Sequence, residues 1–359
     1  MRIPQSTQSF LPLAIVALTI PVGCSGPGYR LAAQDTPNET TRSDWPEYES
    51  RHLSNVRQLT FSEMGLTKSG EAYFSPDLRM IIFQAFPAGE TEYQMFTLRI
   101  DADGKPLRES LVRISPPGGA CTCGYFRPDG RKLIYGSSYL NPHVSNPNSY
   151  HRAGSSYKWD MPGGMDIIEA NIDGSDPRQL TSDLGYDAEC SFSPDGTQIV
   201  FTSDRDGDPD LYIMNADGTN LRQLTNSPGY DGGPFFSPDG KRVIFRADRK
   251  QNDHLQLFVI NADGTGERQL THDSDVVNWA PYWLPDGRSI VFTTSVHGHY
   301  NYEVYMLDIE SGRFNRITYS PGFDGLPVIS SDGKWMMWTS QRTADGQSQV
   351  FLADFRRPE

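Results

Sequence analysis

Basic side chains are scarce relative to acidic ones in this sequence: 32 Lys and Arg residues stand against 45 Asp and Glu residues, a formal net charge of −13. Such a chain offers no basic stripe to phosphate groups, so no nucleic-acid partner is expected. The Gly-x-Ser-x-Gly motif of α/β-hydrolases is also missing, which excludes a hydrolase domain of that class. The acidic surface favours cations or basic partners instead.

Long hydrophobic runs are scarce too. The apolar run at residues 10–23 is too short to span a bilayer and has the length of a signal-peptide core. The following Gly-Cys-Ser resembles a lipoprotein processing site with Cys24 as the lipidated residue, and cleavage near Ala33 is the alternative. Residues 1–24 are therefore predicted to be a signal peptide or lipoprotein leader. We expect the protein in the periplasm or cell envelope, touching the membrane only through a lipid anchor, or else secreted.

Residues 25–54 are rich in Gly, Pro, Thr, Ser and acidic residues and show no pattern that could form a core. This composition predicts a flexible tether. An uncleaved, disordered tail is the other interpretation.

The remaining chain repeats a unit that is clearest between Cys190 and Asp217. Its Ser-Pro-Asp-Gly turn at residues 193–196 supplies a proline with φ near −65° and a glycine for the left-handed position that closes a hairpin. The Asp-Gly pair at residues 217–218 gives a second hairpin. One unit therefore contributes four short antiparallel strands.

The first turn of this unit occurs six times, near Asp77, Asp129, Asp195, Asp239, Asp286 and Asp332. A four-stranded unit of roughly 40 to 45 residues repeated in this way is typical of propeller blades. The sequence predicts an all-β fold, a six-bladed β-propeller of four-stranded antiparallel blades over residues 55–359. Because the repeats start with an outer-strand segment at residues 57–60 and finish one strand short, the N-terminal strand is expected to complete the last blade.

The Arg-x-Leu-Thr, Ser-Pro-Asp-Gly and Tyr-x-Met-Asn-x-Asp-Gly motifs resemble the WD40-like (PD40) repeats of TolB-type propellers over residues 55–355. The resemblance implies a ring that binds a protein partner across one face. Only about 54 residues precede the first repeat strand, so we expect no counterpart of the α/β domain that TolB carries. Leu78 replaces the turn glycine in the first copy, where a left-handed leucine would cost about 1 kcal/mol, and a different turn is expected there.

Three cysteines remain once Cys24 is assigned to lipid: Cys121, Cys123 and Cys190. An oxidising compartment predicts one disulfide and one free thiol. The repeats place Cys123 and Cys190 at nearly equivalent positions on the innermost strands of adjacent blades, so this pair is the predicted disulfide. A bond between Cys121 and Cys123 would strain a strand, and a zinc site would need a second Cys-x-x-Cys.

The two faces of such a ring are expected to differ. The Asp-Gly hairpins share one face, the turn face, whose repetition indicates scaffold. The opposite loop face carries an insertion of about 20 residues within residues 139–164, where aromatic and polar side chains alternate. This mixture suits recognition of a carbohydrate or peptide, with inert decoration as the alternative. The candidate binding residues in it are His143, Tyr150, His151, Tyr157 and Trp159.

Further candidates lie where the innermost strands begin, at the mouth of the central channel. The first position of these strands is Ser69, Cys121, Asp187, Asp231, Asn278 and Asp324; Glu71 and Glu189 follow two residues later, and Tyr186, Tyr230 and Phe323 precede the aspartates. Converging Asp187, Asp231 and Asp324 could hold Ca²⁺ or Mg²⁺, or supply a general acid or base of raised pKa. The simpler interpretation is that each aspartate caps its strand. No other cofactor is expected.

Other polar groups are interpreted as scaffold. Three arginines recur after the second strand and are predicted to form ion pairs between blades with the channel acids: Arg205, Arg249 and Arg342. An acidic run resembles a calcium loop but lacks the later bidentate Glu and flanking helices of an EF-hand, which predicts a solvated turn: Asp204, Asp206, Asp208 and Asp210. His297 and His299 are interpreted as a surface pair.

Two functional hypotheses follow. The first is an exported, monomeric binding module or scaffold that engages a protein or cell-envelope partner through the loop face. The second is a propeller enzyme, a polysaccharide lyase or hydrolase, that uses the channel-mouth carboxylates and the insertion. Catalysis requires acids that converge in a pocket, whereas binding requires an exposed aromatic and polar patch.

Overall fold

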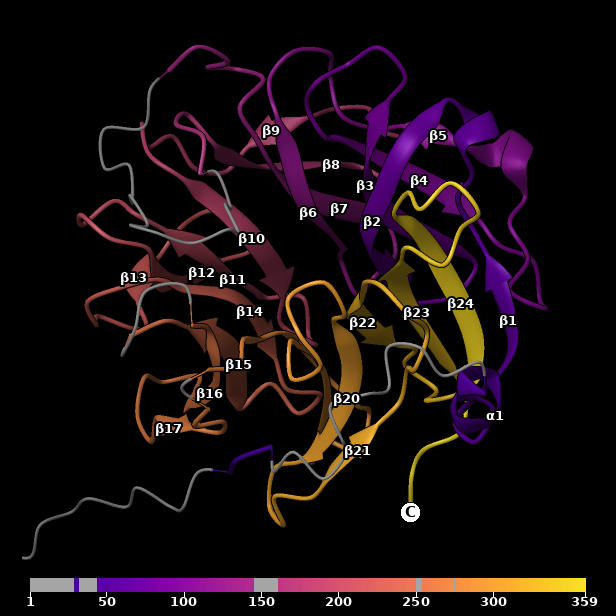
Figure 1. Ribbon diagram of the computed structural model, residues 1–359. Helices are drawn as coiled ribbons and strands as arrows, with labels where there is room; N and C mark the ends of the chain where they lie inside the picture. Colours follow the sequence, from indigo (N-terminus) through magenta and orange to yellow (C-terminus); the bar gives the residue numbers. More distant parts are fainter. Residues whose placement is uncertain (1–28, 32–43, 145–160, 250–253, 274) are drawn as a thin grey trace, which may run out of the picture.

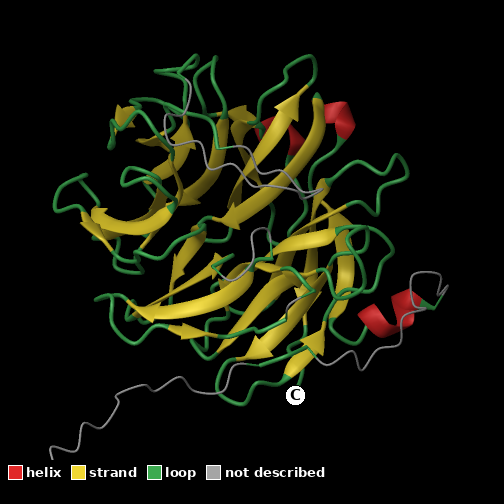
Figure 2. Ribbon diagram, turned by 60° about the vertical axis from the view of Figure 1, so that its left-hand side comes forward, coloured by secondary structure: helices red, strands yellow, loops and turns green. Residues whose placement is uncertain are grey.

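The computed structural model describes residues 29–31, 44–144, 161–249, 254–273 and 275–359. These residues form six four-stranded antiparallel sheets, arranged as blades around a central axis (Figure 1). Figure 2 shows that the little helix present lies at the periphery of the strands. The predicted all-β, six-bladed propeller is confirmed. In the described ranges, no helix is long and apolar enough to cross a membrane.

The blades follow the chain in order, and each runs from its innermost strand outward. Blade one is β2 (Leu66–Phe74), β3 (Met80–Pro87), β4 (Gln94–Arg99) and β5 (Val112–Arg113); blade two is β6 (Cys121–Phe126), β7 (Lys132–Ser137), β8 (Asp166–Asn171) and β9 (Arg178–Gln179). Blade three is β10 (Asp187–Phe192), β11 (Gln198–Ser203), β12 (Asp210–Asn215) and β13 (Arg222–Gln223); blade four is β14 (Asp231–Phe236), β15 (Arg242–Ala247), β16 (Gln256–Asn261) and β17 (Arg268–Gln269). Blade five is β18 (Asn278–Trp283), β19 (Ser289–Thr294), β20 (Glu303–Asp308) and β21 (Phe314–Arg316); blade six is β22 (Asp324–Ile329), β23 (Trp335–Ser340), β24 (Gln349–Phe355) and β1 (Leu53–Gln58).

The first and last strands of the chain close the ring. Strand β1 pairs antiparallel with β24, with Arg57 opposite Leu352, and the two lie side by side in Figure 1. The Arg57 guanidinium also bonds the Asp354 carboxylate at 3.1 Å. The predicted completion of the last blade by the N-terminal strand is therefore confirmed.

Apolar side chains of the second strands pack between neighbouring blades. In β11, Ile199 and Phe201 join Ile134 of blade two, whereas Val200 between them joins Val243 of blade four. This alternation follows from the period of two along a strand. Each such buried side chain stabilises the ring by about 1.5–3 kcal/mol. Clusters of this kind occur at all six interfaces between blades, so the core is distributed around the ring.

The Ser-Pro-Asp-Gly turns form as predicted. Ser193 donates its hydroxyl to Asp195 at 2.6 Å, and Gly196 adopts a φ of 70°. The expectation that the first blade turns differently is wrong, because Leu78 takes the same left-handed conformation with a φ of 57°. Its amide donates to Ser75 at 2.9 Å, as that of Gly196 does to Ser193 at 2.8 Å. The surrounding turn therefore imposes a conformation that costs leucine about 1 kcal/mol.

The described residues before β1 are packed on the ring, which differs from the flexible tether predicted for residues 25–54. Tyr29 pairs with the backbone beside Thr271 of blade four and donates its hydroxyl to the Glu310 carbonyl of blade five at 2.9 Å. Leu31 is buried in the cluster between these two blades. Helix α1 (Trp45–Glu49) then rests against blade six through Glu49. The N-terminal segment thus contacts three blades.

Candidate binding cavity at the channel mouth

A bulge in every innermost strand decides which side chains enter the channel. The bulged residue is the third of five of these strands and the sixth of the longer β2; it lies at a register shift and has a φ between 47° and 59°: Glu71, Cys123, Glu189, Gly233, Ala280 and Leu326. All six line the waist of the channel. A bulge re-aims a side chain in this way because it inserts an extra residue into one strand. The bulge position therefore faces the channel.

The first position of these strands points into the sheet instead. Asp187, Asp231 and Asp324 are almost fully buried, and each binds an arginine of its own. The distances are 2.8 Å from Arg205 to Asp187, 2.8 Å from Arg249 to Asp231 and 2.9 Å from Arg342 to Asp324. None of the three aspartates lines the mouth of the channel. The structure does not bring them together, which removes the geometric basis for a shared metal ion.

The arginine and the aspartate of each pair occur together across the repeats. Every pair is separated by 18 residues. In the blades that have Ser69, Cys121 or Asn278 at the first position, the residue 18 positions later is Pro87, Tyr139 or Val296. The predicted ion pairs are therefore present, but they lie within one blade and not between blades, since the arginine directly follows the strand next to the aspartate.

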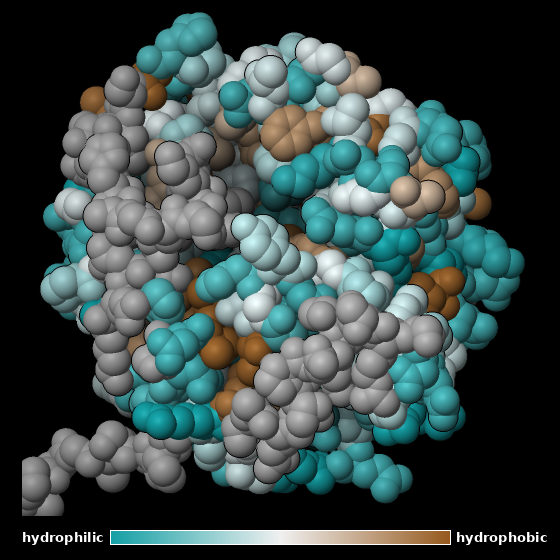
Figure 3. Space-filling model, viewed as in Figure 1, coloured by the Kyte–Doolittle hydropathy of each residue, from teal (hydrophilic) through white to brown (hydrophobic). Residues whose placement is uncertain are grey.

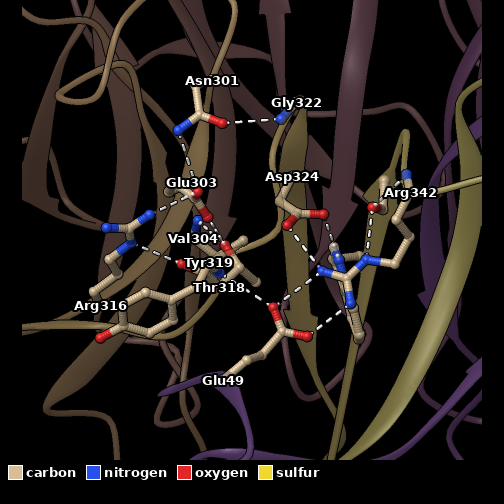
Figure 4. Close-up of polar contacts among 12 residues, drawn as sticks. Glu49, Asn301, Glu303, Val304, Arg316, Thr318, Tyr319, Gly322, Asp324 and Arg342 are labelled. Carbon is tan, nitrogen blue, oxygen red and sulfur yellow. Dashed lines mark hydrogen bonds and ion pairs between the residues drawn. The ribbon is translucent and has the colours of Figure 1, made fainter. Parts of the chain in front are cut away.

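The interface between blades five and six extends this pattern into a buried network (Figure 4). Arg342 binds Glu49 of α1 at 2.7 Å as well as Asp324 at 2.9 Å. Beside them Arg316 binds Glu303 at 2.9 Å. Burial raises the pKa of Glu49, although Arg342 opposes this shift. The network ties the helix that precedes β1 to the two last blades.

Two aspartates, each the first residue of the third strand of its blade, are unfavourable in their ionised form. Burial raises the pKa of Asp166 and that of Asp210 to about 7, and the neighbouring Asp187 and Asp231 add to the respective shifts by repulsion. Each is hydrogen-bonded by the fourth strand of its blade, Asp166 by Gln179 at 2.8 Å and Asp210 by Gln223 at 3.2 Å. Both carboxylates therefore belong to the scaffold between blades.

Asp210→Asn is expected to gain thermal stability relative to the unaltered protein as the pH rises from 5 to 8. Because the folded-state pKa of about 7 exceeds the ordinary value of 3.8, the contribution of Asp210 to stability is fully present below pH 4 and is lost as the pH rises through 7. Asparagine does not ionise and escapes this loss. The Tm difference at pH 5 and pH 8 measures it.

The matched control is Asp217→Asn. Hydrogen bonds from Thr219 lower the pKa of the Asp217 carboxyl, so its contribution does not change between pH 5 and pH 8. A Tm difference for Asp210→Asn that is equally constant over this interval would contradict the prediction.

A cavity of about 860 Å³ opens at the mouth of the channel on the loop face. Figure 3 shows a hollow at the centre of the ring, with apolar side chains beside it. Aromatic rings dominate its wall: Phe86, Tyr93, Tyr186, Trp279, Tyr300, Tyr302 and Phe323. Its polar lining includes Lys68, Glu71, Gln84, Glu92, Arg246 and His299. Aromatic walls with a few convergent polar groups are typical of a ligand site.

A buried ion pair forms the floor of this cavity. Arg246 of β15 contacts Glu189 at 3.2 Å, and the same carboxylate accepts hydrogen bonds from Tyr230 at 2.6 Å, Tyr186 at 3.3 Å and Thr202 at 3.1 Å. A Cβ atom on Gly233 would overlap the Arg246 guanidinium. The glycine is therefore required at this bulge for the arginine to reach the channel.

Below this floor the channel is closed by aromatic side chains. Tyr73, Tyr125, Phe235 and Tyr282 contact one another with ring centroids 5.1 to 6.2 Å apart. A separate apolar pocket of about 380 Å³ lies beyond them on the turn face. The ring consequently has a blind cavity on the loop face and not an open channel.

Comparison with known proteins identifies the repeats. The TolB β-propeller domain (PD40) family model matches residues 158–226 and 264–357. The fold is that of a TolB-like propeller. Two solved structures share its fold: a protein from Agrobacterium tumefaciens assigned to TolB, with 18% identity, a TM-score of 0.57 and coverage of 86% of this chain and 99% of that one, and TolB from Acinetobacter baumannii, with 21% identity, a TM-score of 0.54 and coverage of 80% and 64%.

An uncharacterised protein of Agrobacterium fabrum is 38% identical to the TolB-like propeller over 69 residues, which are 19% of this chain and 22% of that protein. The chain thus matches about a fifth of the length of this curated relative.

The three described cysteines of the TolB-like propeller are free, so the predicted disulfide between Cys123 and Cys190 is wrong. The bulge turns Cys123 toward the channel, where Glu71 neighbours its thiol. The Cys190 side chain packs with Ile134 and Phe192 between blades, and its thiol faces the Cys123 carbonyl at 3.7 Å. The prediction missed that a bulge ends the alternation of side chains along a strand.

The remaining candidates are dispersed over the TolB-like propeller. His143 is exposed on the loop face, whereas Tyr150, His151, Tyr157 and Trp159 lie outside the described residues, as does Cys24. Tyr186 and Tyr230 are buried with their hydroxyls on Glu189, and Asn278 is buried away from the cavity. Phe323 and His299 line it. His297 contacts the Tyr305 hydroxyl at 2.7 Å.

One acidic cluster could accept a metal ion by proximity alone. Within the described part of the chain, Asp206, Asp208 and Asp210 form the only group of three potential ligand residues within 4.8 Å of one another. Asp208 accepts the Gly229 amide at 3.1 Å and Asp210 the Thr225 hydroxyl at 3.0 Å. These contacts agree with a hydrogen-bonded turn.

Sequence reasoning missed Arg246, which dominates the cavity floor. A signal was present, because the equivalent positions in the other second strands are small or neutral: Gln84, Gly136, Thr202, Thr293 and Thr339. A charged side chain in such a central strand marks a functional or structural ion pair.

Proposed function

We propose that this TolB-like propeller is an exported binding module that engages a protein or cell-envelope partner through its loop face, with the mouth cavity as the central contact. The observation that carries the proposal is the aromatic wall of the cavity together with Tyr300 at its rim, whose side chain is 94% exposed. Aromatic residues are enriched in the cores of protein interfaces. A ring as exposed as that of Tyr300 would bury a large apolar area when a partner covers it, which favours binding.

Other apolar side chains on the same face support this proposal. After Tyr300, the most exposed large apolar side chains among the described residues are Leu184 at 60% and Leu140 at 44%. Both belong to loops of the loop face, Leu184 in the connection from β9 to β10 and Leu140 directly after β7. An apolar rim around an aromatic cavity suits a protein or peptide partner.

The alternative of a polysaccharide lyase or hydrolase has less support. It requires carboxylates that converge in the pocket. Asp187, Asp231 and Asp324 bind separate arginines outside the cavity, and Glu189, which does enter the channel, is paired with Arg246. Export to the periplasm or envelope, with a lipid on Cys24, is part of the proposal and rests on the N-terminal sequence and on the likeness to TolB.

A photoreactive amino acid at position 300 of the full-length protein tests the proposed function in cells. We expect a covalent adduct of one discrete mass from position 300 and none from position 334, where Lys334 is 78% exposed on the turn face. Deletion of residues 139–164 is expected to abolish the adduct while the ring stays folded. Equal adducts from both positions, or none from position 300, would argue against a loop-face binding module.

A further inference from the structure

Among the described residues at the waist below the mouth cavity, two carboxylates and one cation are found. Glu71 and Glu189 both enter the channel from the bulges of their strands, and Arg246 is the cation beside them. Arg246 contacts Glu189 at 3.2 Å. Glu189 accepts four further hydrogen bonds, from Tyr186, Thr202, Tyr230 and the Gly233 amide. The charge of Arg246 is therefore matched by Glu189.

Glu71 has weaker partners. It accepts a hydrogen bond from the Tyr73 hydroxyl at 3.3 Å, and the Cys123 thiol lies beside it at the waist. Its side chain lines both the cavity and the waist, and the residue is only 9% exposed. Burial raises the pKa of Glu71, and Glu189 adds to the shift while Arg246 opposes it. A buried carboxylate without a full counter-charge is costly, so a cation that enters the cavity gains by supplying it.

The walls above Glu71 also suit a cation. Trp279, Tyr302 and Phe323 form one aromatic wall, with ring centroids 5.8 to 6.4 Å apart. At the rim, the Lys68 ammonium already lies 5.4 Å from the centroid of the Tyr93 ring. Aromatic faces attract ammonium and guanidinium groups by about 0.5–2 kcal/mol. The cavity thus combines a buried anion with rings that favour organic cations.

We infer that the cavity floor binds an ammonium or guanidinium group, from a Lys or Arg side chain of the partner, with Glu71 as its counter-ion. This deepens the proposed function and rests on it. A metal ion fits less well, because Ca²⁺ takes six to eight oxygen ligands and the carboxylates among the described lining residues are Glu71 and Glu92. An anionic group would meet Arg246 but also Glu71 and Glu189. A basic partner also agrees with the net charge of −13.

Binding of blocked amino acids to the full chain tests this inference by calorimetry or NMR titration. The probes are the N-acetyl methylamides of lysine, arginine, norleucine and glutamate; norleucine has the apolar stem of lysine without its charge. We expect the lysine or the arginine probe to bind about tenfold more tightly than the norleucine probe. Glu71→Gln should remove this preference, whereas Glu92→Gln at the exposed rim of the same cavity should keep it.

Equal affinity for the lysine, arginine and norleucine probes, preference for the glutamate probe, or an unchanged preference in Glu71→Gln would overturn the inference. Displacement of the lysine probe by micromolar CaCl₂ would overturn it in favour of a metal site. The comparison of probes on the unaltered protein stands even where Glu71→Gln fails to fold. An adduct at position 300 without any cation preference would leave the proposed function intact and remove this inference alone.

Discussion

A chain that begins at residue 59, and so lacks β1, is expected to lose cooperative folding. Strand β1 supplies the outer edge of blade six, where it pairs with β24 and buries Leu53. Without it β24 becomes an exposed sheet edge, which promotes aggregation. Loss of one strand of a closed ring should remove most of the roughly 5–15 kcal/mol by which a domain is stable. Thermal unfolding followed by circular dichroism, with size-exclusion chromatography, measures the effect.

The matched control begins at residue 44 and keeps both α1 and β1. We expect it to unfold cooperatively and to remain monomeric. A synthetic peptide of residues 50–60, added to the chain that begins at residue 59, should restore part of the transition. If the two truncated chains melt within a few degrees of each other, the pairing of β1 with β24 contributes little to the stability of the ring.

Arg342→Ala is expected to reduce the free energy of unfolding by about 3–5 kcal/mol, the range for removal of one partner of a buried ion pair. Arg342 binds Asp324 of β22 and Glu49 of α1, and all three side chains are at most 9% exposed. Alanine would leave two carboxylates buried without their cation. Chemical denaturation measures the change in free energy.

The control for this substitution is Arg288→Ala. Arg288 also binds two carboxylates, those of Asp308 and Glu310, but its side chain is 50% exposed. Surface ion pairs contribute about 0–1 kcal/mol, so we expect a loss in that range. Similar losses for the two variants would show that the buried network does not depend on its charge pairing.

The fold could be predicted from the sequence because its information is local and repeated. Each Ser-Pro-Asp-Gly turn specifies a hairpin by itself, and six copies with a missing outer strand determine both the number of blades and the closure by β1. Leu78 is the exception: its left-handed φ of 57° was not predicted, because the rest of the turn imposes a conformation that leucine disfavours.

The site was less predictable because the direction of its side chains is not local. A strict alternation would place Asp187 and Glu189 on the same face of β10, but the bulge at Glu189 separates them into an ion pair inside the blade and the floor of the cavity. The bulge has no mark in the sequence, since Glu, Cys, Ala, Leu and Gly all occupy it. Arg246 reaches the channel only because Gly233 leaves room.

The packing of Tyr29 and Leu31 between blades four and five sets how far the ring could travel from a bilayer. With a lipid on Cys24, four residues would separate the anchor from Tyr29, and the five steps give a maximal reach of about 18 Å, whereas a free tether through residue 54 would allow roughly 100 Å. The rim of blades four and five would then face the membrane. With that rim toward the membrane, the axis of the ring would run parallel to the bilayer, and the loop face would point along the membrane surface.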